Sequence, residues 1–512
     1  MDSNKIKLII LGIVATLVAL YLGITAATAQ FEAIAWVMAG LVTIICIALG
    51  KRVWLLLPLM SALGITIQIP GQPSSGLLAQ VLVLVFCLPI FLLRRLPWQF
   101  AMREMEAWIL ILTLFVVQVY VRHPVGVNLF GGASVGGKPY AIYAICLVSG
   151  LLLGGLKASE NDLKWILRLS IFGGLLNLVI SMLGVLVPTV GYYTDANKSA
   201  EAGHEDYGTV VDVGAATRIG FLGGFSHNLA LWISSYVSPL RACLNPLLGT
   251  LILFSVFAAL MSGFRNSVID VGLVLLLGII YRSGFSGSLV SIGGGICGVG
   301  LLAVVNVIHP LPPNIQRSLT FLPGTWEERY RKDAEGSTEW RVEIWKEVLL
   351  TDRWIDNKWL GDGLGFKASE LAQQMNYRKG SRMGTSGFEA HREAILSNGD
   401  YHSGPVQTIR TIGYVGLLFL LIAQVRLAVH AHRQMHRCRN SEWYPLALFI
   451  GIPLIVSPIF FVLVFGSFTT AFTGLFMGYG MLSMLEKNLP LPAYVKRSRQ
   501  PFELQKVNRA RL

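Results

Sequence analysis

The sequence His402-Ser-Gly-Pro-Val-Gln-Thr-Ile-Arg-Thr-Ile-Gly-Tyr-Val-Gly416 marks the point where a long polar segment gives way to an apolar run that ends at Val425. The polar segment extends from His309 to Thr408, and hydrophobic stretches flank it on both sides. A loop of this length in a compact protein is usually functional. We therefore expect a functional loop whose closing histidine, His402, stands at a membrane surface.

The composition of the chain is that of a membrane protein. Hydrophobic residues make up 54% of the sequence, charged residues only 14%, and the mean hydropathy is +0.59. No soluble domain of this size has such a composition. We count about fourteen apolar segments that approach the ~20 helical residues needed to cross a bilayer core. They lie at approximately 7–29, 31–50, 53–69, 77–93, 107–121, 139–155, 164–187, 219–237, 244–261, 266–280, 289–308, 409–425, 443–465 and 469–485.

The predicted fold is therefore an all-α polytopic membrane protein with a large, partly helical loop. Residues 1–308 would hold spans one to eleven, 309–408 the loop, 409–485 spans twelve to fourteen, and 486–512 a basic tail. The first span, 7–29, is too long for a signal-peptide core and is expected to be retained.

The distribution of lysine and arginine predicts the orientation of these spans. With fourteen spans, the basic connections all fall on one side, which the positive-inside rule assigns to the cytoplasm together with both termini. The formal net charge of +13 is then a signal of topology and of anionic lipid. It is not a signal of nucleic-acid binding, which we exclude. The basic connections are Lys51-Arg52, Arg94-Arg95-Arg103, Lys157-Lys164-Arg168, Arg241, Arg282, Arg426–Arg439 and Lys487–Arg511.

Cysteine and histidine usage predicts neither disulfides nor a metal site. The six cysteines fall within spans or on the cytoplasmic side, so no disulfide framework supports the outer loop. There is no CxxC motif, and we read His430, His432 and His436 as part of a basic cytoplasmic connector. We expect no metal and no cofactor. The cysteines are Cys46, Cys87, Cys146, Cys243, Cys297 and Cys438.

The long loop has an internal order of its own. Pro310-Leu-Pro-Pro313 predicts an extended connector, and Trp326–Leu350 has apolar residues spaced for one face of a helix. Gly361-Asp-Gly-Leu-Gly365 predicts a turn, and no Lys-Ser/Thr follows it as a phosphate loop would require. Arg378–Gly387 is rich in small and basic residues and should be mobile. The loop is expected to rest on the membrane as a lid.

Basic residues at the outer surface are the candidate chemical groups. Arg265, in Met261-Ser-Gly-Phe-Arg-Asn-Ser-Val268, lies on the short outer connection between the ninth and tenth spans. Arg341 lies on the predicted lid helix, and Arg218 at the outer entrance to the eighth span. An arginine at such a place either grips an anion such as diphosphate through its planar fork or is a snorkelling, ion-paired or solvated structural residue.

Two histidines and one further arginine complete the candidates. A neutral imidazole at His402 can accept a hydroxyl proton while arginines hold a phosphate leaving group, although a hydrogen-bonded loop histidine is the commoner case. His227, with Asn228, lies about two turns inside the eighth span, where polar groups are functional by default, and a helix–helix hydrogen bond is the alternative. Together with Arg218, His227 and Arg410 are candidate binding residues for diphosphate or sugar.

Three segments together resemble the O-antigen ligase and O-antigen polymerase superfamily of bacterial membrane proteins. They are Ser262-Gly-Phe-Arg265-Asn-Ser267 on an outer turn, Trp340-Arg-Val-Glu-Ile-Trp345 followed by Leu360-Gly-Asp-Gly-Leu-Gly-Phe366, and His402–Gly416 at the entrance to a span. The resemblance is strongest between Arg218 and Gln424.

The resemblance implies roles for three residues. In that family an outer arginine of the first motif, an arginine of the second and the histidine that opens the third are implicated in binding lipid diphosphate and activating the acceptor. They correspond to Arg265, Arg341 and His402. The chain departs from the family at Ser403, where asparagine is frequent, and around Arg265, where Phe264 and Asn266 replace small residues.

The function implied by the resemblance is that of a GT-C-like glycosyltransferase at the periplasmic face of a bacterial inner membrane. Its donor would be an undecaprenyl-diphosphate-linked oligosaccharide, and no metal would be required. If the acceptor is another lipid-linked repeat, the protein is a polysaccharide polymerase, for which a chain-length regulator is a possible partner. If the acceptor is a lipid A core sugar, it is an O-antigen ligase. A flippase or transporter of lipid-linked sugars is the alternative of another class.

Overall fold

The computed structural model describes most of the membrane-embedded chain. The first predicted span, the stretch Arg378–Gly387 and nearly all of the basic tail lie outside the described residues. The described residues are 31–66, 73–99, 102, 104–126, 136–187, 191, 211–213, 216–365, 392, 395–396, 399 and 401–489.

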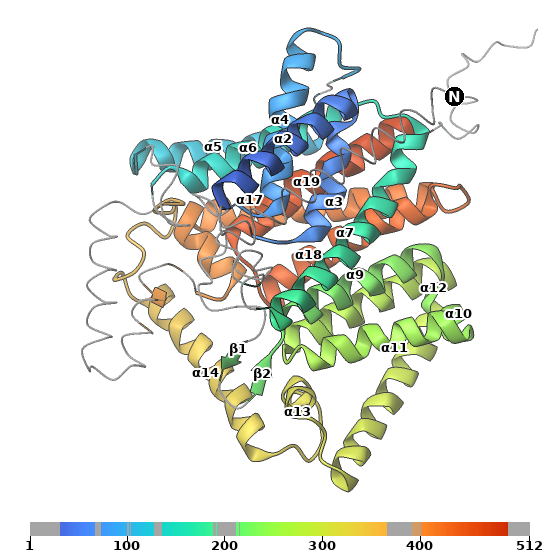
Figure 1. Ribbon diagram of the computed structural model, residues 1–512. Helices are drawn as coiled ribbons and strands as arrows, with labels where there is room; N and C mark the ends of the chain where they lie inside the picture. Colours follow the sequence, from blue (N-terminus) through green and yellow to red (C-terminus); the bar gives the residue numbers. More distant parts are fainter. Residues whose placement is uncertain are drawn as a thin grey trace, which may run out of the picture.

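The described chain is a bundle of helices with one two-stranded antiparallel sheet (Figure 1). In the sheet, β1 (Val211–Val213) pairs with β2 (Ala216–Arg218). The N-terminal helices are α2 (Phe31–Leu49), the 3-10 helix η1 (Gly50–Leu55), α3 (Leu56–Leu63), α4 (Ser75–Leu92), α5 (Glu104–Arg122), α6 (Lys138–Gly155) and α7 (Glu160–Leu186). The remaining helices are α9 (Gly220–Tyr236), α10 (Pro239–Ala242), α11 (Pro246–Met261), α12 (Arg265–Ile308), α13 (Pro313–Leu319), α14 (Glu328–Leu350), α17 (Gly404–Arg437), α18 (Tyr444–Leu463) and α19 (Phe468–Asn488).

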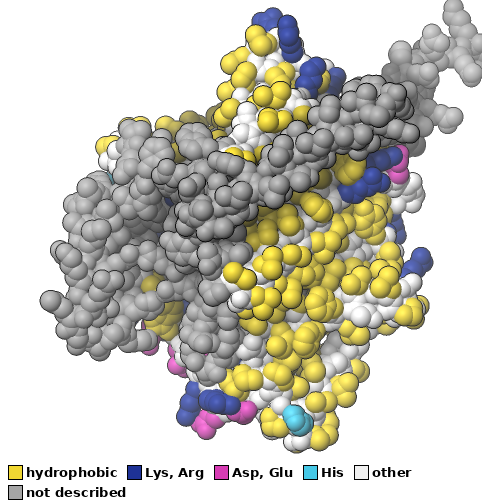
Figure 2. Space-filling view, in the orientation of Figure 1, with side chains coloured by type: hydrophobic (Ala, Val, Ile, Leu, Met, Phe, Trp, Pro, Cys, Tyr) yellow, Lys and Arg dark blue, Asp and Glu magenta, His cyan; other side chains and the backbone are white. Residues whose placement is uncertain are grey.

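Within the described residues, nine helices are long and apolar enough to cross a membrane. Their outer faces are apolar, as lipid contact requires: Leu186 is 75% exposed and Phe172 59% exposed on α7 alone. Figure 2 shows one broad hydrophobic face, with lysine and arginine gathered toward its edges. The predicted class, an all-α multi-pass membrane protein, is confirmed.

The nine candidates among the described helices differ from the fourteen predicted spans at four places, and at the first of these the predicted span 7–29 lies outside the described residues. The helix continues from 31–50 into 53–69 through η1, so residues 40–63 make one candidate span instead of two. The segments 266–280 and 289–308 lie on the two helical parts of α12, which meet at a kink at Gly284 (φ 78°, ψ −176°), so each predicted segment keeps a helix of its own. In addition, α9 and α11 contain only 17 and 16 residues. Fourteen spans therefore stays a prediction.

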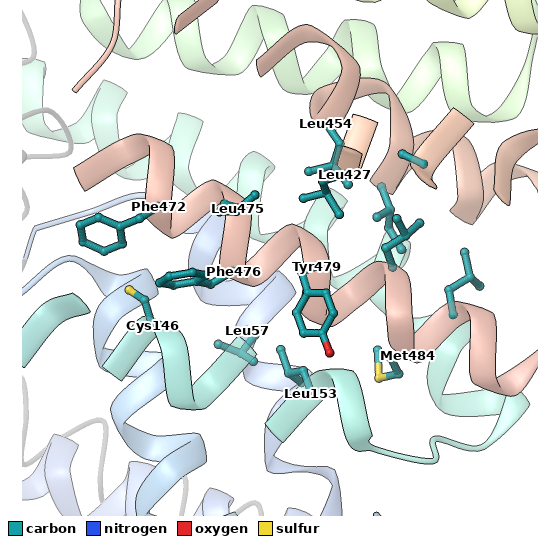
Figure 3. Packing of buried hydrophobic residues seen from close by; sticks show 14 of the residues in the cluster. Leu57, Cys146, Leu153, Leu427, Leu454, Phe472, Leu475, Phe476, Tyr479 and Met484 are labelled. Carbon is teal, nitrogen blue, oxygen red and sulfur yellow. The ribbon is translucent and has the colours of Figure 1, made fainter. Parts of the chain in front are cut away.

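The centre of the bundle is the contact between α19 and α6. Figure 3 shows Phe472 and Phe476 of α19 beside Cys146 of α6, all of which are buried. Farther along, two glycines let the backbones touch: a Cβ on Gly150 would lie 2.5 Å from the carbonyl oxygen of Phe476, and one on Gly480 would lie 2.7 Å from that of Gly150. Small residues at the crossing are how membrane helices approach closely, because lipid supplies no hydrophobic drive to associate.

The residues predicted to share the cytoplasmic side contact one another at one end of the bundle, here named the basic end. Arg52 pairs with Asp162 (2.9 Å), and Lys164 with Glu442 (2.8 Å). All six cysteines have free thiols. The histidine cluster is a correction: it lies on the last turns of α17 and not in a connector. There the His432 ring packs on that of His436, and its Nδ1 lies 2.5 Å from the hydroxyl of Tyr281.

The opposite end, here named the lid end, carries α13, α14 and the strand pair (Figure 1). The helix predicted at 326–350 is confirmed as α14. Of its predicted face, Ile344 is fully buried and Trp340 and Leu349 are partly buried, and Val348, outside that prediction, is also fully buried. They contact Tyr401 and Val406, at the start of α17. The expected extended connector reaches only to Pro312, because Pro313 begins the helix α13, a favourable first helical position for proline.

The break in α17 is the most constrained part of the lid end. Gly413 has φ 77° and ψ 176°, so the helix is interrupted in its third turn. The segment 358–363 fills the break: the amides of Asp362 and Gly363 donate to the carbonyls of Arg410 and Thr411, and the amide of Tyr414 donates to the carbonyl of Lys358. These bonds satisfy backbone groups that the interrupted helix leaves open, as a membrane setting demands.

Candidate functional site

A cavity of about 420 Å³ opens at the lid end, and four arginines line it. Arg218 comes from β2, Arg265 from α12, Arg317 from α13 and Arg341 from α14. No aspartate or glutamate is among its described lining residues. Asp333 of α14 pairs with Arg317, and a cavity lined by four guanidinium groups has a surface suited to an anion.

Arg265 is held in this cavity by the lid helix. It is the first residue of α12, and its guanidinium donates to the carbonyl of Ala334 (3.1 Å) and to the hydroxyl of Thr338 (3.3 Å) on α14. The N-terminus of a helix carries positive partial charge and disfavours a cation there. Arg317 and Arg341 lie near enough to repel the Arg265 guanidinium further. The nearby Asp333 offsets part of this repulsion, and an anion bound in the cavity would offset more of it.

The sequence-based prediction missed Arg317. Its side chain is buried, its Nε lies 2.6 Å from an oxygen of Asp333 on α14, and its Nη1 donates to the carbonyl of Gly263 (2.6 Å). Arg317 thus ties together the lid helix and the turn that precedes Arg265. In the sequence, Arg317 stands between Gln316 and Ser318, shortly after the Pro310–Pro313 segment. This polar setting does not distinguish it from a solvated surface arginine.

Arg341 projects from one face of α14. Ser337, Thr338, Arg341, Val342 and Trp345 line the cavity at the spacing of successive helical turns. The indole of Trp345 donates to the carbonyl of Tyr401 (2.7 Å), so the arginine-bearing face is fixed against the start of α17.

Arg218 reaches the same space from the strand pair. Its guanidinium lies 5.7 Å from the centre of the Phe264 ring, a cation–π distance. Phe264 is the N-cap residue of α12, directly before Arg265. The unusual phenylalanine in the first motif therefore serves as a platform for a second arginine.

His402 lies next to the cavity without being one of its lining residues. Its ring centre is 5.5 Å from that of Trp340 and 6.1 Å from that of Phe465, and Phe465 also lines the cavity. The backbone of His402 has φ 50°, a left-handed conformation that costs about 1 kcal/mol or more for a residue with a Cβ. Strain of this kind persists only where the surroundings impose it, and it gathers at functional sites. Burial raises the pKa of the neighbouring Tyr401 to about 12, which keeps that phenol neutral.

Part of the cavity wall is apolar and exposed. Leu463, at the end of α18, is 76% exposed, and Phe321 is 46% exposed. Val464 and Phe465 continue this wall. A cavity that combines clustered guanidinium groups with exposed hydrocarbon at a helix end suits a ligand that is an anion at one end and a lipid at the other.

The remaining two predicted residues lie elsewhere. His227 lines a second cavity of about 240 Å³ together with Asp270, and its Nδ1 lies 2.6 Å from a carboxylate oxygen of Asp270. Arg410 lines neither cavity: it is buried in α17, its guanidinium packs against Gly399, and its carbonyl accepts from Asp362. The structure thus brings Arg218, Arg265 and Arg341 together and separates Arg410 from them.

No group of three or more histidine, cysteine or acidic side chains within the described part of the chain is placed to hold a metal ion. In comparisons with known proteins, no family model and no curated protein matched this chain.

Proposed function

We propose that the protein is a membrane glycosyltransferase that polymerises undecaprenyl-diphosphate-linked oligosaccharide repeats at the periplasmic face of a bacterial inner membrane. The observation that carries the proposal is the four-arginine cavity with an exposed apolar wall, at the lid end of a multi-pass helical bundle. The GT-C-like architecture and the cytoplasmic location of both termini belong to the same proposal.

The physical argument starts from the lipid. Withdrawing a polyprenyl tail from the bilayer costs ~0.8 kcal/mol for each CH₂ group exposed. The diphosphate must therefore stay at headgroup depth, and the catalytic groups must come to it. Arg265 at the start of α12 and Leu463 at the end of α18 both line the cavity, and this position at the ends of two apolar helices supports the proposal of headgroup depth.

The reaction would be a direct transfer. The acceptor hydroxyl attacks the anomeric carbon of the donor sugar, the bond from that carbon to the phosphate oxygen breaks, and the diphosphate leaves with the electron pair. Arg265 and Arg341 would neutralise the charge that develops on the leaving group, a contribution of several kcal/mol in a partly dry site. His402 would accept the proton of the acceptor hydroxyl. In this scheme the guanidinium groups supply the positive charge.

One observation favours a second candidate, a transporter of lipid-linked sugars. Two membrane helices, α12 and α17, are interrupted at Gly284 and Gly413. Interrupted helices are typical of transporters that bind cargo near the bilayer midplane. The arginine cavity lies at one end of the bundle, which favours the enzyme.

The test is a transfer assay with purified protein in liposomes containing undecaprenyl-diphosphate-linked oligosaccharide. We expect longer lipid-linked chains to form. We expect Arg341→Ala and Arg265→Ala each to lower the rate by at least about 100-fold, with poor rescue by lysine, because a point charge cannot reproduce the bidentate fork.

The matched control is Arg331→Ala, on an exposed face of the same helix as Arg341, whose ion pair within the described residues is with Glu335 (3.8 Å). It should leave the rate unchanged. Movement of the oligosaccharide across the bilayer without chain growth would establish the transporter instead. Growth only on a lipid A core acceptor would establish the ligase.

A further inference from the structure

The second cavity, lined by His227 and Asp270, has the chemistry of a carbohydrate site. Asp270 holds Nδ1 of His227 at 2.6 Å, which fixes the orientation of the imidazole ring and turns its Nε2 away from the carboxylate. No hydrogen bond joins Nε2 to any other residue that the structure describes. Both side chains are about one quarter exposed, at 26% and 23%. The pair therefore offers polar atoms to a ligand in the cavity.

The rest of the cavity wall comes from α18, α19 and the turn between them. Phe460, Phe461 and Phe465 supply aromatic rings, and Ser457 and Thr470 supply hydroxyl groups. Pyranose rings present an apolar C–H face and a rim of hydroxyl groups, so they need aromatic surface together with a few directional hydrogen-bonding groups. A polar pair inside a membrane helix bundle costs free energy and marks a functional site by default.

This second cavity lies next to the cavity that the arginines line. Phe465 lines both cavities, and the adjacent residues Ile269 and Asp270 of α12 line one cavity each. A ligand whose diphosphate lies among the arginines would therefore place one of its two substituents near His227, and only a substituent with hydroxyl groups can bond to His227 and Asp270. In a lipid-linked glycan that substituent is the first sugar.

We infer that the cavity of His227 and Asp270 binds a sugar ring of the lipid-linked glycan, beside the diphosphate in the arginine cavity. This inference rests on the proposed function and names the sugar-binding part of the same site. Asp270 acts as a positioning residue for His227, and the Nε2 of His227 bonds a sugar hydroxyl.

The experiment measures equilibrium binding to the full-length protein in detergent. The probes are undecaprenyl diphosphate alone and the same lipid carrying one glucose, galactose or N-acetylglucosamine. The variants are Asp270→Asn and the double variant His227→Gln/Asp270→Asn, in which two amides can keep a neutral hydrogen bond inside the membrane. Arg341→Ala is the comparison that should weaken all probes.

We expect wild-type protein to bind at least one sugar-bearing lipid about tenfold more tightly than the bare lipid, the gain of one or two well-made hydrogen bonds. Both Asp270→Asn and the double variant should lose this gain, while their affinity for the bare lipid stays within about twofold of the wild-type value. The retained affinity for the bare lipid also shows that the variants are folded. The inference is overturned if the gain persists in the variants, if they lose the bare lipid as well, or if wild-type protein shows no gain. Failure of wild-type protein to bind even the bare lipid would instead overturn the proposed function.

Discussion

Replacing Gly413 by alanine tests whether the break in α17 organises the lid end. The residue has φ 77° and ψ 176°, a region open to glycine almost alone, and a side chain there costs about 1–3 kcal/mol. The added Cβ would also fall on the carbonyl of Trp359, far inside van der Waals contact. The segment 358–363 must then withdraw from α17.

The size of the expected effect follows from the hydrogen bonds that this withdrawal breaks. The amides of Asp362, Gly363 and Tyr414 donate their hydrogen bonds across this junction, and each contributes about 0.5–1.5 kcal/mol. Together with the backbone strain, we expect local opening to become easier by about 3 kcal/mol or more, which is a loss of protection of roughly 100-fold.

Hydrogen exchange followed by mass spectrometry of the detergent-solubilised protein measures this directly, on peptides that cover 358–364 and 410–416. The matched control is Gly474→Ala on α19, where a Cβ would meet nothing within 4 Å. That change should leave exchange unaltered or slightly slower, because alanine favours a helix. Equal protection of the 358–364 peptide in Gly413→Ala and wild-type protein would refute the reasoning.

Three further predictions follow from the site and the orientation of the bundle. Arg317→Ala removes one partner of a buried ion pair and should weaken the docking of α14 by about 3–5 kcal/mol; unchanged proteolysis of the connection between α13 and α14 would argue against it. His402→Gly relieves the left-handed strain at that residue, so the protein should melt no lower than wild type while transfer falls at least about 100-fold with the lost proton acceptor; full activity would remove His402 from the mechanism. A membrane-impermeant thiol reagent should label Glu335→Cys in intact cells and the exposed native Cys243 only after permeabilisation; the reverse pattern would invert the topology.

Several features of this protein were predictable from local sequence. The membrane class follows from composition, and the helix α14 follows from the spacing of its apolar residues, which the structure buries at Ile344 and Val348. The gathering of Arg52 and Lys164 at one end with other basic residues agrees with the positive-inside pattern. The composition, the spacing of apolar residues in α14 and the charges beside each span are all properties of the linear sequence, so they can be read without the tertiary structure.

The number and continuity of the membrane spans were harder to predict from the sequence. The apolar runs at 31–50 and 53–69 predict separate spans, but the helix continues between them through η1, and residues 40–63 form one candidate span. The amino-acid sequence does not show whether the φ angle of a given glycine is positive or negative, because glycine adopts both signs readily. At Gly413 it is the close contact with the backbone of Trp359 and Leu360 that decides that the residue interrupts a helix.

Some residues of the candidate site could likewise be predicted from the sequence, and others could not. Arginine residues on an outer turn and on a lid helix were visible as Arg265 and Arg341, since their residue type and their place beside apolar spans are local properties. Three other features were not visible in the sequence. They are the contact of Arg317 with Gly263, the pairing of His227 with Asp270, and the position of Arg410 away from both cavities. These join or separate groups that lie dozens of residues apart, and the free energy of such contacts depends on geometry that exists only after the helices have packed.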